Sequence, residues 1–158
     1  MRFSHELRYD ADPGDVFAMV TDPGFREAVC EHQQVLRFTV TVEGDEGLVT
    51  VDVDQVQAAR GIPPVAARFV GDEIEIEQRE VWHSPEAASF LVTIPGKPAR
   101  LDGSITLRAQ GEQTVETFTG DIEVSIPFVG AKIESMVGDL VHLALRAEHA
   151  VGVEWLSS

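Results

Sequence analysis

The chain has 158 residues, 44% of them hydrophobic, and its 27 acidic and 12 basic side chains give a formal net charge of −15. This length and hydrophobic content fit one folded domain over residues 1–158 and exclude wholesale disorder. The negative charge argues against nucleic-acid binding and against anionic membrane surfaces, and no apolar run approaches the ~20 residues of a membrane-spanning helix. The N-terminus has no apolar signal core, and the single cysteine, Cys30, permits no internal disulfide, so we expect a cytoplasmic protein.

The first part of the chain predicts one strand followed by two short helices. Apolar and polar residues alternate over residues 2–9, which is typical of a half-buried strand. Asp12 and Asp22 each precede a proline, and this pair of residue types is a signal for a helix start. We therefore predict helices over residues 13–20 and about 23–34.

The middle of the chain predicts six further strands joined mainly by short turns rich in glycine, proline and acidic residues. Gly61, Pro63 and Pro64 interrupt this pattern, so residues 65–70 are expected to form a loop or a single helical turn. Successive hairpins favour an antiparallel sheet. The predicted strands cover residues 35–43, 48–57, 73–83, 87–95, 99–110 and 113–126.

After Pro127 the apolar period changes to that of a long helix over about residues 129–155. A helix of this length, about 40 Å, needs a broad sheet to lie across, which indicates an α+β fold. Its expected sheet-facing stripe is Val129, Ile133, Met136, Val137, Leu140, Ala144, Ala147, Val151 and Trp155. The expected solvent face is Lys132, Ser135, Asp139, His142, Arg146 and His149.

The element order β-α-α-β6-α resembles the START-like superfamily, also described as polyketide cyclase/birch-pollen-allergen or SRPBCC proteins, over the whole chain. Three stretches are similar to a family of uncharacterised actinobacterial proteins within it: the opening residues 1–5 (MRFSH), the pair Val81-Trp82 and residues 119–130 (TGDIEVSIPFVG). The resemblance implies a helix-grip fold, in which a curved antiparallel sheet wraps around the C-terminal helix and leaves a cavity. It implies no single reaction, because members bind diverse lipids, polyketides or hormones and some catalyse ring closure.

Five polar residues fall on the apolar side of predicted strands: His5, Gln55, Gln57, Gln78 and Glu80. An unpaired carboxylate in the interior is costly and tends to take up a proton, so Glu80 needs an explanation. Three explanations stay open: a β-bulge that turns Glu80 outward, a structural pair or hydrated pocket mouth, and a working acid/base pair with His5. The sequence has no phosphate-binding loop, serine-nucleophile elbow or metal-ligand spacing, so we expect no cofactor and no metal.

The preferred hypothesis is a carrier or sensor that binds an apolar small molecule, such as a lipid, a polyketide-like aromatic or an isoprenoid, between sheet and helix. The alternative is a cyclase- or hydrolase-type enzyme that uses Glu80 or His5 for proton transfer. A third hypothesis is an interaction module whose acidic face meets a basic protein partner, although no local motif identifies such a partner. The expected ligand contacts are Phe38, Val40, Val51, Gln78, Glu80, Phe90, Val92, Ile105, Phe118, Ile122, Met136 and Leu140.

Overall fold

The computed structural model of the protein describes residues 1–60 and 62–158. Within these residues, an N-terminal strand and two helices come first, and a sheet-forming region and a long helix follow. The elements are β1 (Arg2–Tyr9), α1 (Pro13–Val20), α2 (Pro23–His32), β2 (Arg37–Asp45), β3 (Leu48–Ala58), α3 (Pro64–Val70), β4 (Glu73–Ser84), β5 (Ala87–Thr93), β6 (Ala99–Gln110), β7 (Gln113–Val124) and α4 (Gly130–Ser157).

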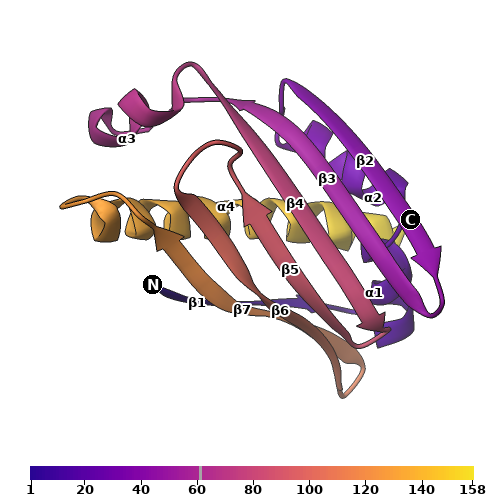
Figure 1. Ribbon diagram of the computed structural model, residues 1–158. Helices are drawn as coiled ribbons and strands as arrows, with labels where there is room; N and C mark the ends of the chain where they lie inside the picture. Colours follow the sequence, from indigo (N-terminus) through magenta and orange to yellow (C-terminus); the bar gives the residue numbers. More distant parts are fainter. Residues whose placement is uncertain (61) are drawn as a thin grey trace.

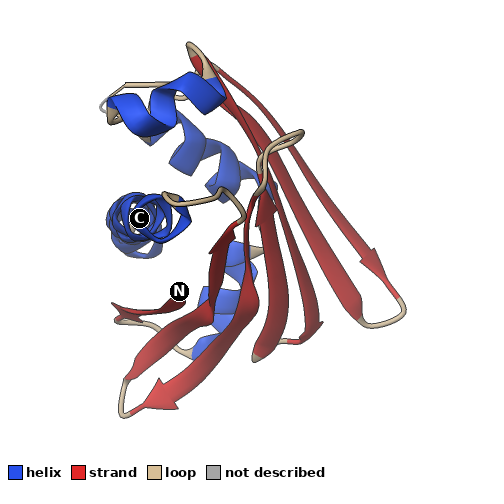
Figure 2. Ribbon diagram, turned by 60° about the vertical axis from the view of Figure 1, so that its left-hand side comes forward, coloured by secondary structure: helices blue, strands red, loops and turns tan. Residues whose placement is uncertain are grey.

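The strands of the described residues form one antiparallel sheet in the order β1-β7-β6-β5-β4-β3-β2. The sheet is curved, and α4 runs along its inner side while α1 and α2 cover the same side near the C-terminal end of α4 (Figures 1 and 2). This is the predicted α+β, helix-grip architecture. None of the described helices is long and apolar enough to cross a membrane.

The two short helices start where the sequence predicts. The carboxylate of Asp12 accepts a hydrogen bond from the Asp15 N–H at 3.0 Å, and Asp22 does the same for Gly24 at 2.7 Å. These contacts satisfy N–H groups that a helix start leaves without partners. The second helix ends at His32, two residues earlier than predicted, and Gln34 adopts a left-handed backbone (φ 56°) before the chain enters β2.

Strand alternation places the core as expected. Trp82 is 1% exposed and the inward residues of β6 and β7, such as Ile105 and Ile122, are also buried. The pairing of β4 with β5 is regular from Glu77 to Trp82, and its irregularity lies beyond, between Trp82 and Ser84. A bulge therefore does not turn Glu80 outward, and this carboxylate points into the protein.

The predicted helix stripe is only partly correct. Ile133 is buried, but Leu140 is 51% exposed, and Trp155 is also exposed. The buried positions of α4 also include Gly138, Glu148 and Gly152. The reason is close packing: a Cβ at Gly138 would lie 2.7 Å from Met1 Cε, and one at Gly152 would lie 2.6 Å from Tyr9 Cε1. Because small residues mark the contact with Met1 and β1, a stripe drawn through large apolar side chains is rotated away from it.

Candidate functional site

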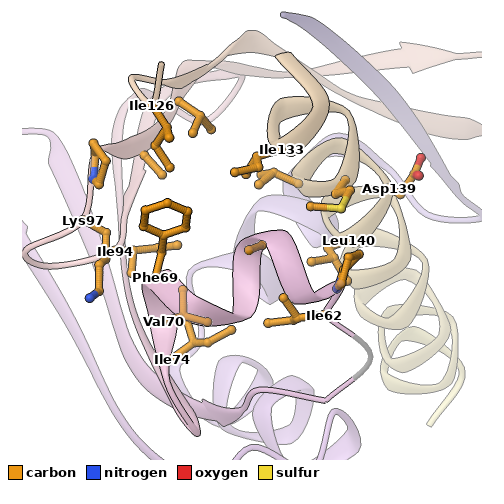
Figure 3. Close-up of a pocket in the computed structure, with 17 residues that line it drawn as sticks. Ile62, Phe69, Val70, Ile74, Ile94, Lys97, Ile126, Ile133, Asp139 and Leu140 are labelled. Carbon is orange, nitrogen blue, oxygen red and sulfur yellow. The ribbon is translucent and has the colours of Figure 1, made fainter. Parts of the chain in front are cut away.

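A cavity of about 270 Å³ opens between the N-terminal half of α4, helix α3 and one end of the sheet (Figure 3). Aliphatic and aromatic side chains from all three regions point into it, and Phe69 lies across from Ile133. Lys97 and Asp139 are the charged residues on its lining within the described chain. The lining residues are Ile62, Pro63, Ala66, Phe69, Val70, Ile74, Ile94, Lys97, Pro98, Ala99, Val124, Ile126, Ile133, Met136, Val137, Asp139 and Leu140.

Local sequence explains the walls of this cavity. Pro64 occupies the first turn of α3, where it needs no N–H partner, and the helix stops at Gly71 with a left-handed backbone (φ 74°). Gly130 opens α4, and a Cβ there would lie 2.6 Å from the carbonyl oxygen of Val124. Glycine therefore lets the start of α4 approach the end of β7 and sets the angle at which the helix leaves the sheet.

Of the predicted ligand contacts, Met136 and Leu140 line the cavity. The others lie outside its lining, and contact of a ligand with them stays a prediction. Five of them are core residues: Val51, Phe90, Ile105, Phe118 and Ile122. Phe38, Val40, Val92 and Gln78 are half-buried on the strands. The sequence interpretation missed the contribution of α3, because the proline-rich segment before it indicated only a loop or a single turn.

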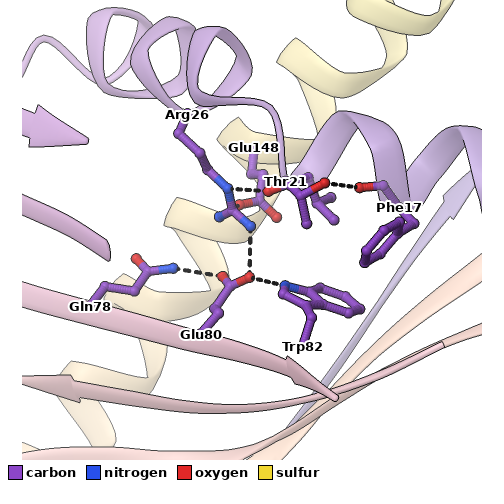
Figure 4. A network of polar contacts seen from close by, with 8 residues as sticks. Phe17, Thr21, Arg26, Gln78, Glu80, Trp82 and Glu148 are labelled. Carbon is purple, nitrogen blue, oxygen red and sulfur yellow. Dashed lines mark hydrogen bonds and ion pairs between the residues drawn. The ribbon is translucent and has the colours of Figure 1, made fainter. Parts of the chain in front are cut away.

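Glu80 lies in a buried ion pair outside that lining (Figure 4). Its Oε1 accepts hydrogen bonds from Arg26 Nη2 at 2.7 Å and Trp82 Nε1 at 3.0 Å, and its Oε2 accepts one from Gln78 Nε2 at 3.0 Å. The carboxylate is 2% exposed and both oxygens are occupied. Glu80 thus forms a structural pair, which is one of the three explanations that the sequence left open.

Arg26, a residue that the sequence analysis missed, joins three elements. From α2, its Nε donates to the Val20 carbonyl oxygen at 2.7 Å, and its Nη1 donates to Glu148 of α4 at 3.2 Å. Burial alone would lower the pKa of this guanidinium, but the carboxylates of Glu80 and Glu148 raise it, so the group stays charged. The available signal was its position: Arg26 shares a helix face with Val29 and Cys30.

Two more buried carboxyl groups surround this ion pair. Burial raises the pKa of Glu148 to about 7, with Arg26 opposing that rise, and burial with the charge of Glu148 raises the pKa of Glu116 well above its usual range. Burial and the charge of Glu116 also raise the pKa of Tyr9. Tyr9 Oη, Glu116 Oε1 and Glu148 Oε2 have no hydrogen-bond partner in the described part of the chain. With Arg26 and Glu80 they form the buried charge cluster, in which one arginine faces three carboxyl groups.

His5 pairs with a different residue from the one considered in the sequence. Its Nδ1 lies 2.6 Å from Nδ1 of His142, and His149 contacts the Arg8 carbonyl oxygen at 2.8 Å. These two α4 histidines therefore contact β1, although the sequence pattern placed them on the solvent face. Partial burial and the neighbouring His142, Arg146 and His149 lower the pKa of His5.

Neither metal nor thiol chemistry has a visible site in the described residues. No three His, Cys, Asp or Glu side chains converge there as metal ligands. Burial raises the pKa of Cys30 to about 11, so this residue is a thiol at neutral pH and a poor nucleophile.

Comparisons with known proteins agree with the observed fold. The "Uncharacterized protein Rv0481c" of Mycobacterium tuberculosis is 23% identical over 121 residues, which is 73% of this chain and 70% of that protein. The crystal structure of TTHA0849 from Thermus thermophilus matches with a TM-score of 0.69 and 18% identity over 100% of both chains. A START superfamily protein from Mycobacterium smegmatis matches with a TM-score of 0.61 and 15% identity over 98% of both chains. At these identities the two structures support the START-like fold alone.

The predicted resemblance is confirmed at the level of the family. The matching family model covers residues 4–156, nearly the whole chain. The chain belongs to the family described as "Protein of unknown function (DUF2505)".

Proposed function

We propose that the protein binds an apolar small molecule in the cavity beside α3 and acts as a carrier or sensor of that molecule. One observation supports this most: the lining is almost entirely aliphatic and aromatic, with Lys97 and Asp139 as its charged members among the described residues. Ligand pockets typically combine such a lining with a small number of polar groups.

The size of the cavity limits the part of the ligand that it encloses. An enclosed apolar cavity of ~150 Å³ is known to hold benzene. A cavity of about 270 Å³ therefore fits roughly two fused rings or the end of an alkyl or isoprenoid chain. A larger ligand would extend through the opening into solvent.

The buried charge cluster does not favour the enzymatic alternative. Glu80 is saturated with hydrogen bonds and lies outside the cavity lining, and His5 is paired with His142 on another face of α4. A general acid or base must reach the reacting group within hydrogen-bond distance. Neither residue has such access to a molecule in this cavity.

A cavity-filling variant tests the proposal. Met136→Trp places a larger side chain in the lining, and Leu143→Trp adds the same side chain at an exposed position of the same helix. We expect Met136→Trp to abolish binding of a fluorescent apolar probe and Leu143→Trp to retain it. Native mass spectrometry of protein from its own host would then identify a bound molecule. Equal probe binding by Met136→Trp and the wild type would contradict the proposal.

A further inference from the structure

We infer that the rim of the cavity docks on an anionic lipid membrane, with Phe128 as the inserting side chain. The rim is defined here as residues 59–60 and 62–72, residues 94–98 and residues 125–132. These segments connect β3 to β4, β5 to β6, and β7 to α4, so they meet at one end of the sheet, where α3 and the start of α4 lie (Figure 1).

Phe128 is the feature of the rim that the folded chain does not explain. Its exposed fraction is 106%, whereas the other phenylalanines of the chain are buried or half-buried. Its backbone is left-handed (φ 70°), a conformation that bulky residues rarely adopt. Both its exposure and its backbone are unfavourable for the folded protein, and glycine would fit the backbone better. We attribute the presence of phenylalanine at this position to a contact outside the chain.

The surroundings of Phe128 place that contact at the cavity opening. Ile126 precedes it and Ile133 follows it, and both line the cavity. Pro127 beside it is exposed, and Leu140 on the lining is half in solvent. An exposed apolar edge next to an apolar cavity would let a ligand pass between a lipid phase and the cavity without crossing water.

Charge supports a membrane with anionic lipids as the partner. The described rim carries Arg60, Arg68, Lys97 and Lys132 against one acidic residue, Asp72, and the two lysines are the only ones in the chain. Asp139 lies on the cavity lining. The charge of Glu134 nearby is compensated by the N-terminal ammonium, whose nitrogen lies 2.9 Å from Glu134 Oε1. The rim is thus cationic although the whole chain has a net charge of −15. Each lysine or arginine near an anionic bilayer strengthens the binding of a protein to that bilayer.

The opposite end of the sheet has the reverse charge. Its connections are residues 10–12, 46–47, 85–86 and 111–112, which carry no lysine or arginine. Their acidic residues are Asp10, Asp12, Glu46, Glu86 and Glu112. A strand of the length of β4, 12 residues, spans about 40 Å, several times the ~8 Å screening length at physiological ionic strength. The acidic end therefore does not oppose docking of the rim and would orient the rim toward the membrane.

Vesicle co-sedimentation tests this inference, with phosphatidylcholine vesicles prepared with and without phosphatidylglycerol. We expect the wild type to bind the anionic vesicles more strongly. Phe128→Gly should weaken that binding at least about fivefold and leave the thermal midpoint unchanged or higher. Lys97→Glu with Lys132→Glu should weaken it about tenfold on anionic vesicles, with a smaller effect on phosphatidylcholine alone.

Two controls separate this inference from the proposed function. Leu48→Ala removes an exposed apolar side chain at the acidic end and should bind vesicles like the wild type. Met136→Trp should lose the apolar probe but keep vesicle binding, because the filled cavity leaves the rim intact. The inference is wrong if the wild type binds neither vesicle, if Phe128→Gly binds as well as the wild type, or if Phe128→Gly alters only the oligomeric state.

Discussion

The two halves of α4 face opposite kinds of interior. Residues 130–140 border an apolar cavity with Ile133 and Met136, whereas residues 141–157 contribute Glu148 to a buried charge cluster. Strongly raised carboxyl pKa values are common at functional sites. Here the buried carboxyl groups with raised pKa values, Glu116 and Glu148, lie in the interior around the C-terminal half of α4. The cavity beside the N-terminal half has an apolar lining. In this protein, the strongly raised carboxyl pKa values belong to the cluster that joins α2 and α4 to the sheet, and the candidate binding site lies at the other end of α4.

Among the variants considered below, we expect replacement of Arg26 in the buried charge cluster to cause the largest loss in the free energy of unfolding. Arg26→Met leaves Glu80, Glu148 and Glu116 buried without a positive charge, and breaking a buried ion pair costs about 3–5 kcal/mol. We expect a loss of this size in the free energy of unfolding, measured by urea denaturation. Binding of the apolar probe should persist under conditions where the variant is folded, because Arg26 does not line the cavity.

A matched control uses an arginine on the surface. Arg79 donates hydrogen bonds to Asp52, from Nε to Oδ1 at 2.7 Å and from Nη2 to Oδ2 at 3.0 Å. These distances are as short as those of Arg26, but the side chain of Arg79 is largely exposed. Arg79→Met should therefore cost less than about 1 kcal/mol. If both variants lose the same free energy of unfolding, burial is not what gives Arg26 its importance.

Glu148 provides a second test. Its titration should change the free energy of unfolding by on the order of 1–3 kcal/mol. Its pKa rises from an ordinary value of 4.5 to about 7 in the folded protein. A raised pKa means that the folded state holds the proton more tightly, so this contribution to stability is complete below pH 4.5 and is lost as pH rises through about 7. The free energy of unfolding should therefore decrease between about pH 4.5 and 7 and level off above that range.

The neutral isostere is the sharpest variant for this pH dependence. Glu148→Gln keeps the size of the side chain and cannot ionise, so its free energy of unfolding should decrease less than that of the wild type over the same pH range. Glu154→Gln, at an exposed position of the same helix, should follow the wild type. Parallel pH profiles for Glu148→Gln and the wild type would exclude Glu148 as the group responsible.

The sequence predicted the elements better than their contacts. Period-two alternation placed Glu80 and Trp82 inside because a strand has only two faces. The partner of Glu80 could not be predicted in the same way, since Arg26 reaches it from a helix 54 positions earlier in the chain. The face of α4 was misjudged because its contact with Met1 and β1 depends on Gly138 and Gly152, which carry no hydrophobic signal. The cavity wall at α3 was missed for a similar reason, as a helix of seven residues has little periodicity.

His5 gives the smallest expected effect and a pH dependence of opposite sign. Partial burial and the charges of His142, Arg146 and His149 lower its pKa below 6.5, so its contribution to stability is present above pH 6.5 and is lost as pH falls. One ring can donate to the other across the 2.6 Å Nδ1–Nδ1 contact, whereas two protonated rings bring two N–H groups together. Because His5 is only half-buried and solvent screens the neighbouring charges, we expect a change below about 0.5 kcal/mol.

NMR titration of the histidine ring protons resolves an effect of this size. In His142→Gln, an amide N–H can still donate to His5, but the neighbouring positive charge is gone, so the pKa of His5 should rise toward 6.5. His32→Gln, at an exposed site on α2, should leave it unchanged. An unchanged His5 pKa in His142→Gln would mean that burial and the charges of Arg146 and His149 lower it without a contribution from His142. With the predicted rise, two opposed pH responses would meet at the C-terminal half of α4, that of Glu148 on the core side and that of His5 on the edge strand β1.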